Sequence, residues 1–242
     1  MILRSPWNSA LAAVGLCALL SACDMGSVTT GETRTETVSI DLDDSTSARV
    51  ELRMGAGELR VASGASKLME GKFSYNVAEW KPVVDYRAGG TSVGELKLSQ
   101  PHSSGSSFGN TVNHWDVKLN GDLPLKISAN LGAGEAHLVL GTMNVARVGM
   151  SIGAGKVDMD LRGEPKRDYT VQIRGGVGET VVHLPKDVGI SATATKGIGN
   201  ISIEGLEQRD GVWINPERVG APVTVRLDVK GGVGQIRLVR DR

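Results

Sequence analysis

A glycine pair that encloses one small or apolar residue recurs along this chain, and its spacing constrains the fold more than any other feature. The copies begin at Gly55, Gly132, Gly153, Gly176, Gly197 and Gly232. Counted at the second glycine, the four central copies are separated by 21, 23 and 21 residues, and the last interval is 35 residues. A fixed period of roughly 20–50 residues is typical of solenoids and other repeat architectures.

The residues after each glycine pair alternate between polar and apolar types. The first position after the pair is always polar: Glu58, Glu135, Lys156, Glu179, Asn200 and Gln235. The second and fourth positions are mostly apolar, as in Leu59 and Val61 or Ile236 and Leu238. Alternation of this kind predicts strands with one buried face and one solvated face. A seventh, degenerate copy is predicted at residues 92–94, where Ser-Val-Gly precedes the same alternation.

These patterns predict an all-β fold, a β-solenoid of stacked short strands with about 21–23 residues per coil and glycine corners. Hairpin meanders repeat more often, about every 8–12 residues. The glycines are expected at corners that need positive φ or close backbone approach, and the residue between them is expected to fill the interior. The final strand, near residues 237–240, is expected to lie exposed at the end of the stack.

The first 22 residues resemble the signal peptide of a bacterial lipoprotein. Arg4 gives a basic start, residues 10–20 form an apolar stretch, and Leu-Ser-Ala-Cys ending at Cys23 resembles a lipobox. This resemblance implies cleavage before Cys23, acylation of that cysteine and anchoring to a membrane. Asp24 resembles the signal that retains enterobacterial lipoproteins in the inner membrane. The expected location is therefore the cell envelope, on the periplasmic face of the inner membrane.

The expected organisation after this signal peptide is a flexible tether over residues 23–35 and one solenoid domain over residues 36–242. Within the domain, residues 62–120 are less regular, and residues 206–222 form an insert before the last strand. We expect the apolar part of this insert, which includes Trp213, to pack back over the end of the solenoid. The alternative is that Trp213 is a hot spot for a binding partner.

Composition excludes some classes of partner. The chain has 27 Lys and Arg residues against 27 Asp and Glu residues, so no overall field favours nucleic acid, and no nucleic-acid partner is predicted. Aromatic residues make up only 4% of the chain. This scarcity argues against carbohydrate grooves and single-strand platforms that stack their ligands on aromatic faces.

Glycine-rich motifs can also bind phosphate or calcium, but these repeats lack the other residues that such sites need. The dinucleotide fingerprint requires a helix after its glycines, and the alternation predicts strands instead. Calcium-binding repeats read G-G-x-G-x-D, whereas Thr180 and Ile236 stand where the carboxylate belongs. The four histidines show no metal-binding spacing. We therefore predict neither a metal nor a cofactor.

Side chains on adjacent coils are the remaining candidates for a site. The repeat places Glu135, His137, Lys156, Asp158 and Glu179 next to one another on one exposed face. Glycoside hydrolysis needs two carboxyl groups about 5–9 Å apart, so one interpretation is a carbohydrate-active β-helix enzyme that uses the three acidic residues. Because the lysine falls between the two glutamates, we favour a solvated charge ladder that serves as an interaction surface.

The repeated strands GAGEL, GAGEA, GVGET and GVGQI behind a lipobox resemble the toast-rack proteins. These are bacterial β-solenoids related to adhesin-type proteins and to the LiaF-like domains of the cell-wall-active antibiotic response. The resemblance implies the solenoid fold and supplies no catalytic motif. Together with the residues above, it leads us to predict a non-enzymatic, lipid-anchored protein. Such a protein would present a rigid β surface to an envelope protein or glycan.

Overall fold

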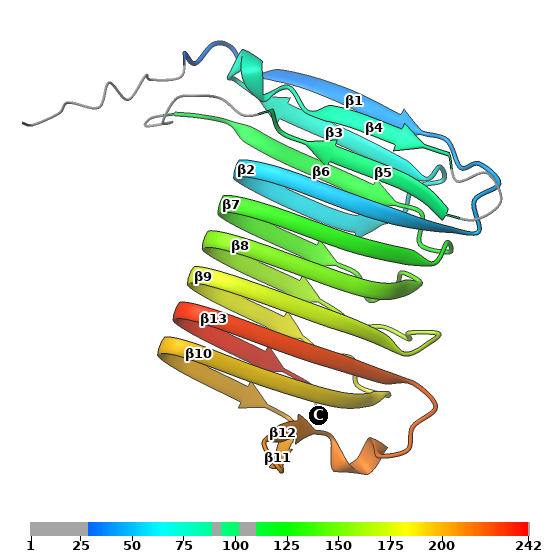
Figure 1. Cartoon of the computed structure of the whole chain (residues 1–242), viewed down its shortest axis with the longest axis vertical. Helices are drawn as coiled ribbons and strands as arrows, with labels where there is room; N and C mark the ends of the chain where they lie inside the picture. Colours follow the sequence, from blue (N-terminus) through cyan, green and yellow to red (C-terminus); the bar gives the residue numbers. More distant parts are fainter. Residues whose placement is uncertain (1–28, 89–92, 102–109, 242) are drawn as a thin grey trace, which may run out of the picture.

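The structure is a computed structural model that describes residues 29–88, 93–101 and 110–241 (Figure 1). Within these residues the chain forms thirteen strands that join in one sheet, and two short 3-10 helices, η1 (Ala78–Trp80) and η2 (Pro216–Arg218). Cys23, Asp24 and the rest of the predicted tether up to residue 28 lie outside the described residues, and β1 begins at Arg34, inside the predicted tether.

The strands follow one another along the chain with short connections. In chain order they are β1 (Arg34–Ile40), β2 (Ser47–Ser63), β3 (Met69–Tyr75), β4 (Val83–Arg87), β5 (Val93–Ser99), β6 (Asn113–Leu119), β7 (Leu125–Val139), β8 (Val145–Asp160), β9 (Tyr169–His183), β10 (Gly189–Glu204), β11 (Glu207–Arg209), β12 (Val212–Ile214) and β13 (Thr224–Val239). Six of these, β2, β7, β8, β9, β10 and β13, are 15–17 residues long. Each long strand contains one glycine pair.

Each long strand bends at its glycine pair and so contributes to two facing layers. We call the halves before the glycine pairs the first layer and the halves after them the second layer. Parallel pairing keeps the pairs in register, with Ala56 opposite Ala133, then Ala154, then Val177. The bends therefore form one straight edge, which runs down the left of Figure 1 and which we call the bend edge. The predicted β-solenoid with glycine corners is confirmed.

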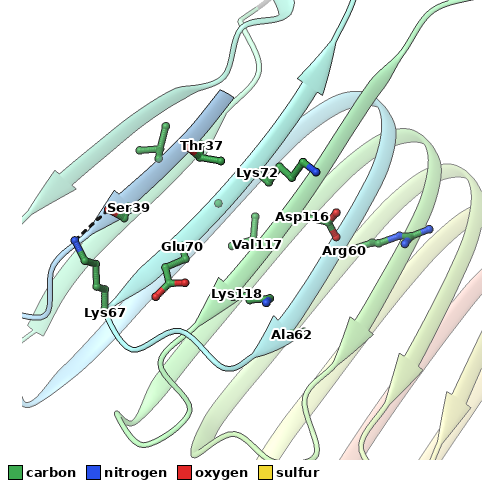
Figure 2. Close-up of a pocket in the computed structure, with 12 residues that line it drawn as sticks. Thr37, Ser39, Arg60, Ala62, Lys67, Glu70, Lys72, Asp116, Val117 and Lys118 are labelled. Carbon is green, nitrogen blue, oxygen red and sulfur yellow. Dashed lines mark hydrogen bonds between the residues drawn. The ribbon is translucent and has the colours of Figure 1, made fainter. Parts of the chain in front are cut away.

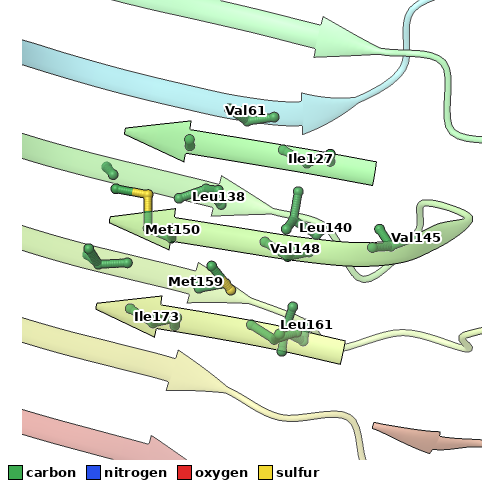
Figure 3. Close-up of a cluster of buried hydrophobic side chains, with 14 of the residues drawn as sticks. Val61, Ile127, Leu138, Leu140, Val145, Val148, Met150, Met159, Leu161 and Ile173 are labelled. Atoms are coloured by element: carbon green, nitrogen blue, oxygen red, sulfur yellow. The ribbon is translucent and has the colours of Figure 1, made fainter. Parts of the chain in front are cut away.

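The apolar side chains of both layers fill the space between them (Figure 3). Leu138 and Met159 stack in the second layer, and Ile127, Val148 and Ile173 face them from the first; all five are at most 2% exposed. Burying a side chain of this size stabilises the folded state by about 1.5–3 kcal/mol. The alternation in the sequence thus becomes a continuous core with a solvated surface on each layer.

The glycines are required by backbone geometry, and one expectation about the bends is wrong. The second glycine of each pair has positive φ; at Gly155 it is +129°, and an added Cβ would lie 1.9 Å from the carbonyl oxygen of Gly134. The residue between the glycines was expected inside, but Val177, Val233 and Ile198 are 56%, 46% and 73% exposed. At the apex of a tight bend, the side chain points away from the interior.

The irregular region lies at the N-terminal end of the stack. There the two halves of β2 have different partners: β5 and then β4 extend the first layer, whereas β6, β3 and β1 extend the second. The edge-to-face pair of Phe73 and Trp115, with ring centroids 5.6 Å apart, fills the core beneath the second layer. The degenerate copy at residues 92–94 is not a bend, because Gly94 pairs with Ala48 at the start of β2, whereas Ser92 lies outside the described residues.

The opposite end of the stack departs from chain order. The strand β13 lies between β9 and β10, so Arg237 is flanked by Val181 and Ser202. The expectation that the final strand is exposed is therefore wrong, because residues 205–223 carry the chain past β10 and back into the stack. The terminal coil is β10, and the insert packs against it through the β11–β12 hairpin.

Candidate interaction surface

Parallel pairing in register aligns the outward side chains of the second layer in rows that run across the strands. We call this surface the second-layer face. One row contains Glu58, Glu135, Lys156, Glu179, Gln235 and Asn200. The next row contains Arg60, His137, Asp158, Val181, Arg237 and Ser202. The sheet thus spreads one surface over six coils, polar except at Val181, which is apolar and only 7% exposed.

The five strand residues predicted as a surface site all lie in these two rows. Glu135, Lys156 and Glu179 are consecutive in the first row, and His137 and Asp158 are neighbours in the second. The Lys156 ammonium lies 3.8 Å from a carboxylate oxygen of Glu179, and the imidazole Nε2 of His137 lies 3.3 Å from a carboxylate oxygen of Glu135. The arrangement is a ladder of partly exposed ion pairs.

Such pairs contribute little to stability, roughly 0–1 kcal/mol each. Lys156 also separates Glu135 from Glu179, and Asp158 lies 3.7 Å from the imidazole Nε2 of His183 instead of facing another carboxylate. A glycosidase needs two carboxyl groups that face each other across the scissile bond, and no two of these three carboxylates face each other directly. The geometry suits binding better than hydrolysis.

Trp213 is not part of this ladder. It lies on β12 in the insert, opposite Ala192 of β10, and is half-buried against the main core. Asn215 fixes the same segment, because its buried side chain accepts a hydrogen bond from the Ile190 amide and donates one to the Val188 carbonyl, both at 2.7 Å. The insert therefore closes the end of the first layer.

The N-terminal end of the second-layer face is hollowed by a groove of about 620 Å³ (Figure 2). Its polar lining comes from β1, β3, β6, β2 and the loop before β3, and consists of Thr37, Ser39, Arg60, Lys67, Glu70, Lys72, Asp116 and Lys118. The rows continue here, with Lys72 opposite Asp116 and Asp116 opposite Arg60. Opposite charges alternate across neighbouring strands, so the groove carries both signs.

Local hydrogen bonds hold the rim of this groove. Lys67 donates to the Ser39 hydroxyl at 3.2 Å and lies 2.8 Å from Asp41, and this contact raises the pKa of the lysine. The Ser66 hydroxyl donates to Glu70 and lowers the pKa of that carboxyl group. Sequence reasoning missed this groove, although the polar alternation of residues 35–39 and 70–74 indicated a solvated face.

The two faces differ in charge although the whole chain is neutral. Among the described residues, nine cations point outward from the first layer against four carboxylates: Arg49, Arg53, Arg87, Lys97, Lys126, Arg147, Arg174, Arg226 and Lys230 against Glu51, Asp85, Glu95 and Asp228. The second layer has five cations against eight carboxylates: Arg60, Lys72, Lys118, Lys156 and Arg237 against Glu58, Glu70, Asp116, Glu135, Asp158, Asp160, Glu179 and Glu204. Total composition concealed this difference.

In the part of the chain that the structure describes, His, Cys, Asp and Glu side chains form no group of three or more that could hold a metal ion. The helices found there are too short and polar to cross a membrane.

The family follows from comparison with known proteins. Residues 29–183 match the N-terminal domain of toast_rack. The chain belongs to the toast-rack family. A crystal structure of a putative cell adhesion protein from Clostridium sporogenes is similar, at 32% identity and a TM-score of 0.83 over 87% of this chain and 100% of that one.

More distant structures also align with this toast-rack chain. A putative adhesin from Bacteroides fragilis shares 6% identity at a TM-score of 0.28, over 88% of this chain and 99% of that one. A putative lipid binding protein from Parabacteroides distasonis shares 12% identity at a TM-score of 0.29, over 88% of this chain and 100% of that one. No curated protein matches the sequence.

Proposed function

We propose that this protein is a non-enzymatic, adhesin-like component of the bacterial cell envelope that binds an envelope protein or glycan through the second-layer face. The observation that carries the proposal is the set of in-register polar rows. They form a stiff, extended surface, and Lys156 interrupts the carboxylates that an enzyme would use. The similar Clostridium sporogenes protein, described as a putative cell adhesion protein, supports the same class of function.

The proposal includes attachment to the membrane through an acylated Cys23, with Asp24 directing retention on the periplasmic face of the inner membrane. Its support is the lipobox-like sequence before Cys23. A tether over residues 23–35 would connect the lipid to the solenoid. Rigid coils on a short flexible tether would present their outer faces to large partners near the membrane.

The test is retention of solubilised envelope proteins and glycans by the purified mature protein. Reversing one charge in the rows, with Lys156→Glu, should weaken retention several-fold, because it leaves four carboxylates side by side, at positions 58, 135, 156 and 179. Lys126→Glu, which makes the same exchange on the first layer, is the matched control and should retain binding. Equal retention by all three proteins would contradict the proposal. Polysaccharide hydrolysis that disappears in Glu179→Gln would establish an enzyme instead.

A further inference from the structure

The first layer carries a second groove, of about 770 Å³, beside the bend edge. One row of side chains in register lines it: Arg53 of β2, Asn130 of β7, Ser151 of β8 and Arg174 of β9. Since neighbouring strands lie about 4.8 Å apart, the two guanidinium-bearing positions are about 14 Å apart along the stack. The groove therefore runs across four strands, parallel to the axis of the solenoid.

Glycines form part of the lining of this groove. They are the first glycines of four successive bends, Gly55, Gly132, Gly153 and Gly176. A Cβ on any of the last three would lie 2.2–2.5 Å from the carbonyl oxygen of the glycine on the neighbouring coil, so side chains are excluded at these positions. Apolar residues also contribute to the lining: Met54, Leu131, Ile152 and Trp80.

The lining of the groove is rich in donors and contains no carboxylate. Arg174 has no ion-pair partner among the described residues. Arg53 is paired with Glu51, which lies outside the groove: its Nε donates to a carboxylate oxygen of Glu51 at 2.6 Å and its Nη2 lies 2.5 Å from the same oxygen, so its Nη1 stays available to a ligand. Asn130 and Ser151, between the two arginines, can each donate to an oxygen. The side-chain oxygen Oε1 of Gln100, at one end, already accepts hydrogen bonds from the Gly55 amide and the Asn113 side chain, both at 2.9 Å.

We propose that this groove binds a segment of an acidic polysaccharide. Guanidinium groups recognise carboxylates in two-pronged hydrogen bonds, so Arg53 and Arg174 would hold acidic groups at the two ends of the segment. Asn130 and Ser151 would bind sugar hydroxyls between them. This mode of recognition depends on charge and hydrogen bonds, so the scarcity of aromatic residues does not oppose it. The inference goes beyond the proposed function, because it assigns a second binding site, with its ligand class, to the opposite layer.

Other anionic partners fit less well. A bilayer presents a flat array of headgroups that cannot enter a groove, and a lone phosphate would occupy only one of the two arginine sites. The groove on the second-layer face does not compete for this ligand class, because Glu70 and Asp116 line it. A chain of linked acidic sugars matches both the length and the charge of the first-layer groove.

Isothermal titration calorimetry with hexagalacturonate tests the inference. The methyl ester of hexagalacturonate is the control ligand, because it has the same sugar backbone and no charge. The mature protein should bind the acid and not the ester. Arg174→Gln should raise the Kd about tenfold, a loss of about 1.4 kcal/mol. Lys126→Gln removes the same charge from the same face outside the groove, and should change the Kd less than twofold. Circular dichroism would confirm that both variants are folded.

Four outcomes would overturn the inference: no binding of hexagalacturonate, equal binding of the ester, equal losses in the two variants, or tighter binding to anionic vesicles that is unchanged in Arg174→Gln. The envelope-retention experiment separates this inference from the proposed function. If envelope material is retained without binding of hexagalacturonate, only the groove assignment fails. If hexagalacturonate binds through Arg174 without envelope retention, the second-layer proposal fails and the groove stands.

Discussion

The second glycine of each bend holds a φ between +129° and +139°, a conformation that residues with a Cβ rarely adopt. The same position also lies against the carbonyl of the neighbouring coil, so conformation and contact both require glycine. Single residues therefore fix where each coil turns. Other single residues hold the connections between coils. Asp160, at the end of β8, accepts hydrogen bonds from the backbone and the side chain of Arg162 in the connection that follows.

We expect Gly155→Val to destabilise the protein by about 1–3 kcal/mol from backbone strain, with a further loss from the clash with Gly134. Gly149→Val is the matched control, because a Cβ there would approach only the Ser128 hydroxyl, at 4.0 Å. The control should change stability by no more than about 0.5 kcal/mol. Urea unfolding measures both values, and equal midpoints for the two variants would contradict the corner assignment.

Stability should also fall in acid through Asp160. Hydrogen bonds from the Arg162 side chain hold the pKa of this carboxyl group below its usual value. A lowered folded-state pKa contributes stability above the unfolded pKa, about 3.9, and this contribution is lost as pH falls through the folded value. Asp160→Asn should therefore be less stable than wild type at pH 7, and the difference should shrink below about pH 4. A constant difference across that range would disprove the linkage.

At the scale of elements, the alternation and the glycine pairs predicted the strands, the bends and the core, because both are local properties of the chain. The position of β13 between β9 and β10 could not be predicted in this way. The two last coils carry equivalent patterns, with Ile236 and Leu238 matching Ile201 and Ile203. Either order of β10 and β13 would satisfy these two patterns. The order that forms depends on how the insert crosses the end of the stack.

Local sequence patterns likewise predicted only part of the two surfaces. The repeat correctly placed Glu135, Lys156 and Glu179 side by side, since register follows from the glycines. The second-layer groove was missed because it depends on β1, β3 and β6, which are not copies of the repeat. The first-layer groove was missed because its polar row precedes the glycine pairs, whereas the predicted surface used the residues after them. The strand β5 was assigned to a bend because Gly94-Glu95-Leu96 copies the local pattern, although it pairs with only one half of β2.

The insert should stabilise the terminal coil β10 mainly through the buried side-chain amide of Asn215. In Asn215→Ala, the Ile190 amide and the Val188 carbonyl lose their partner, which should cost about 1–3 kcal/mol. Hydrogen exchange should increase at Gly189–Ala192 of β10 and remain unchanged in β7. Asn200→Ala, at an exposed position of the same strand, is the control and should leave exchange at Ile190 as in wild type.

The whole molecule has a basic first-layer face and an acidic second-layer face, so the proposed lipid anchor would hold two chemically different surfaces near one membrane. A neutral total charge therefore does not imply a neutral surface. In a search for partners, each face should be tested separately, as the variants on Lys156 and Arg174 are designed to do.

The proposed anchor gives a direct prediction for the whole molecule. Cys23→Ala should move the protein from the membrane fraction to the soluble fraction, because acyl chains contribute about 0.8 kcal/mol per buried methylene. Fractionation of cells followed by immunoblotting measures the change. Asp24→Ser would serve as a comparison, because it should leave the protein membrane-bound. Membrane association that persists in Cys23→Ala would refute lipidation at this residue.

The place of β13 also determines the order in which the molecule can be completed during synthesis. The coils of β2, β7, β8 and β9 can assemble as each one emerges, since each rests on the coil made before it. The strand β10 emerges next, but no strand made before it is its partner in the sheet, because β13 lies between β9 and β10. The sixteen residues of β13 must therefore pair with β9 before β10 can join the sheet.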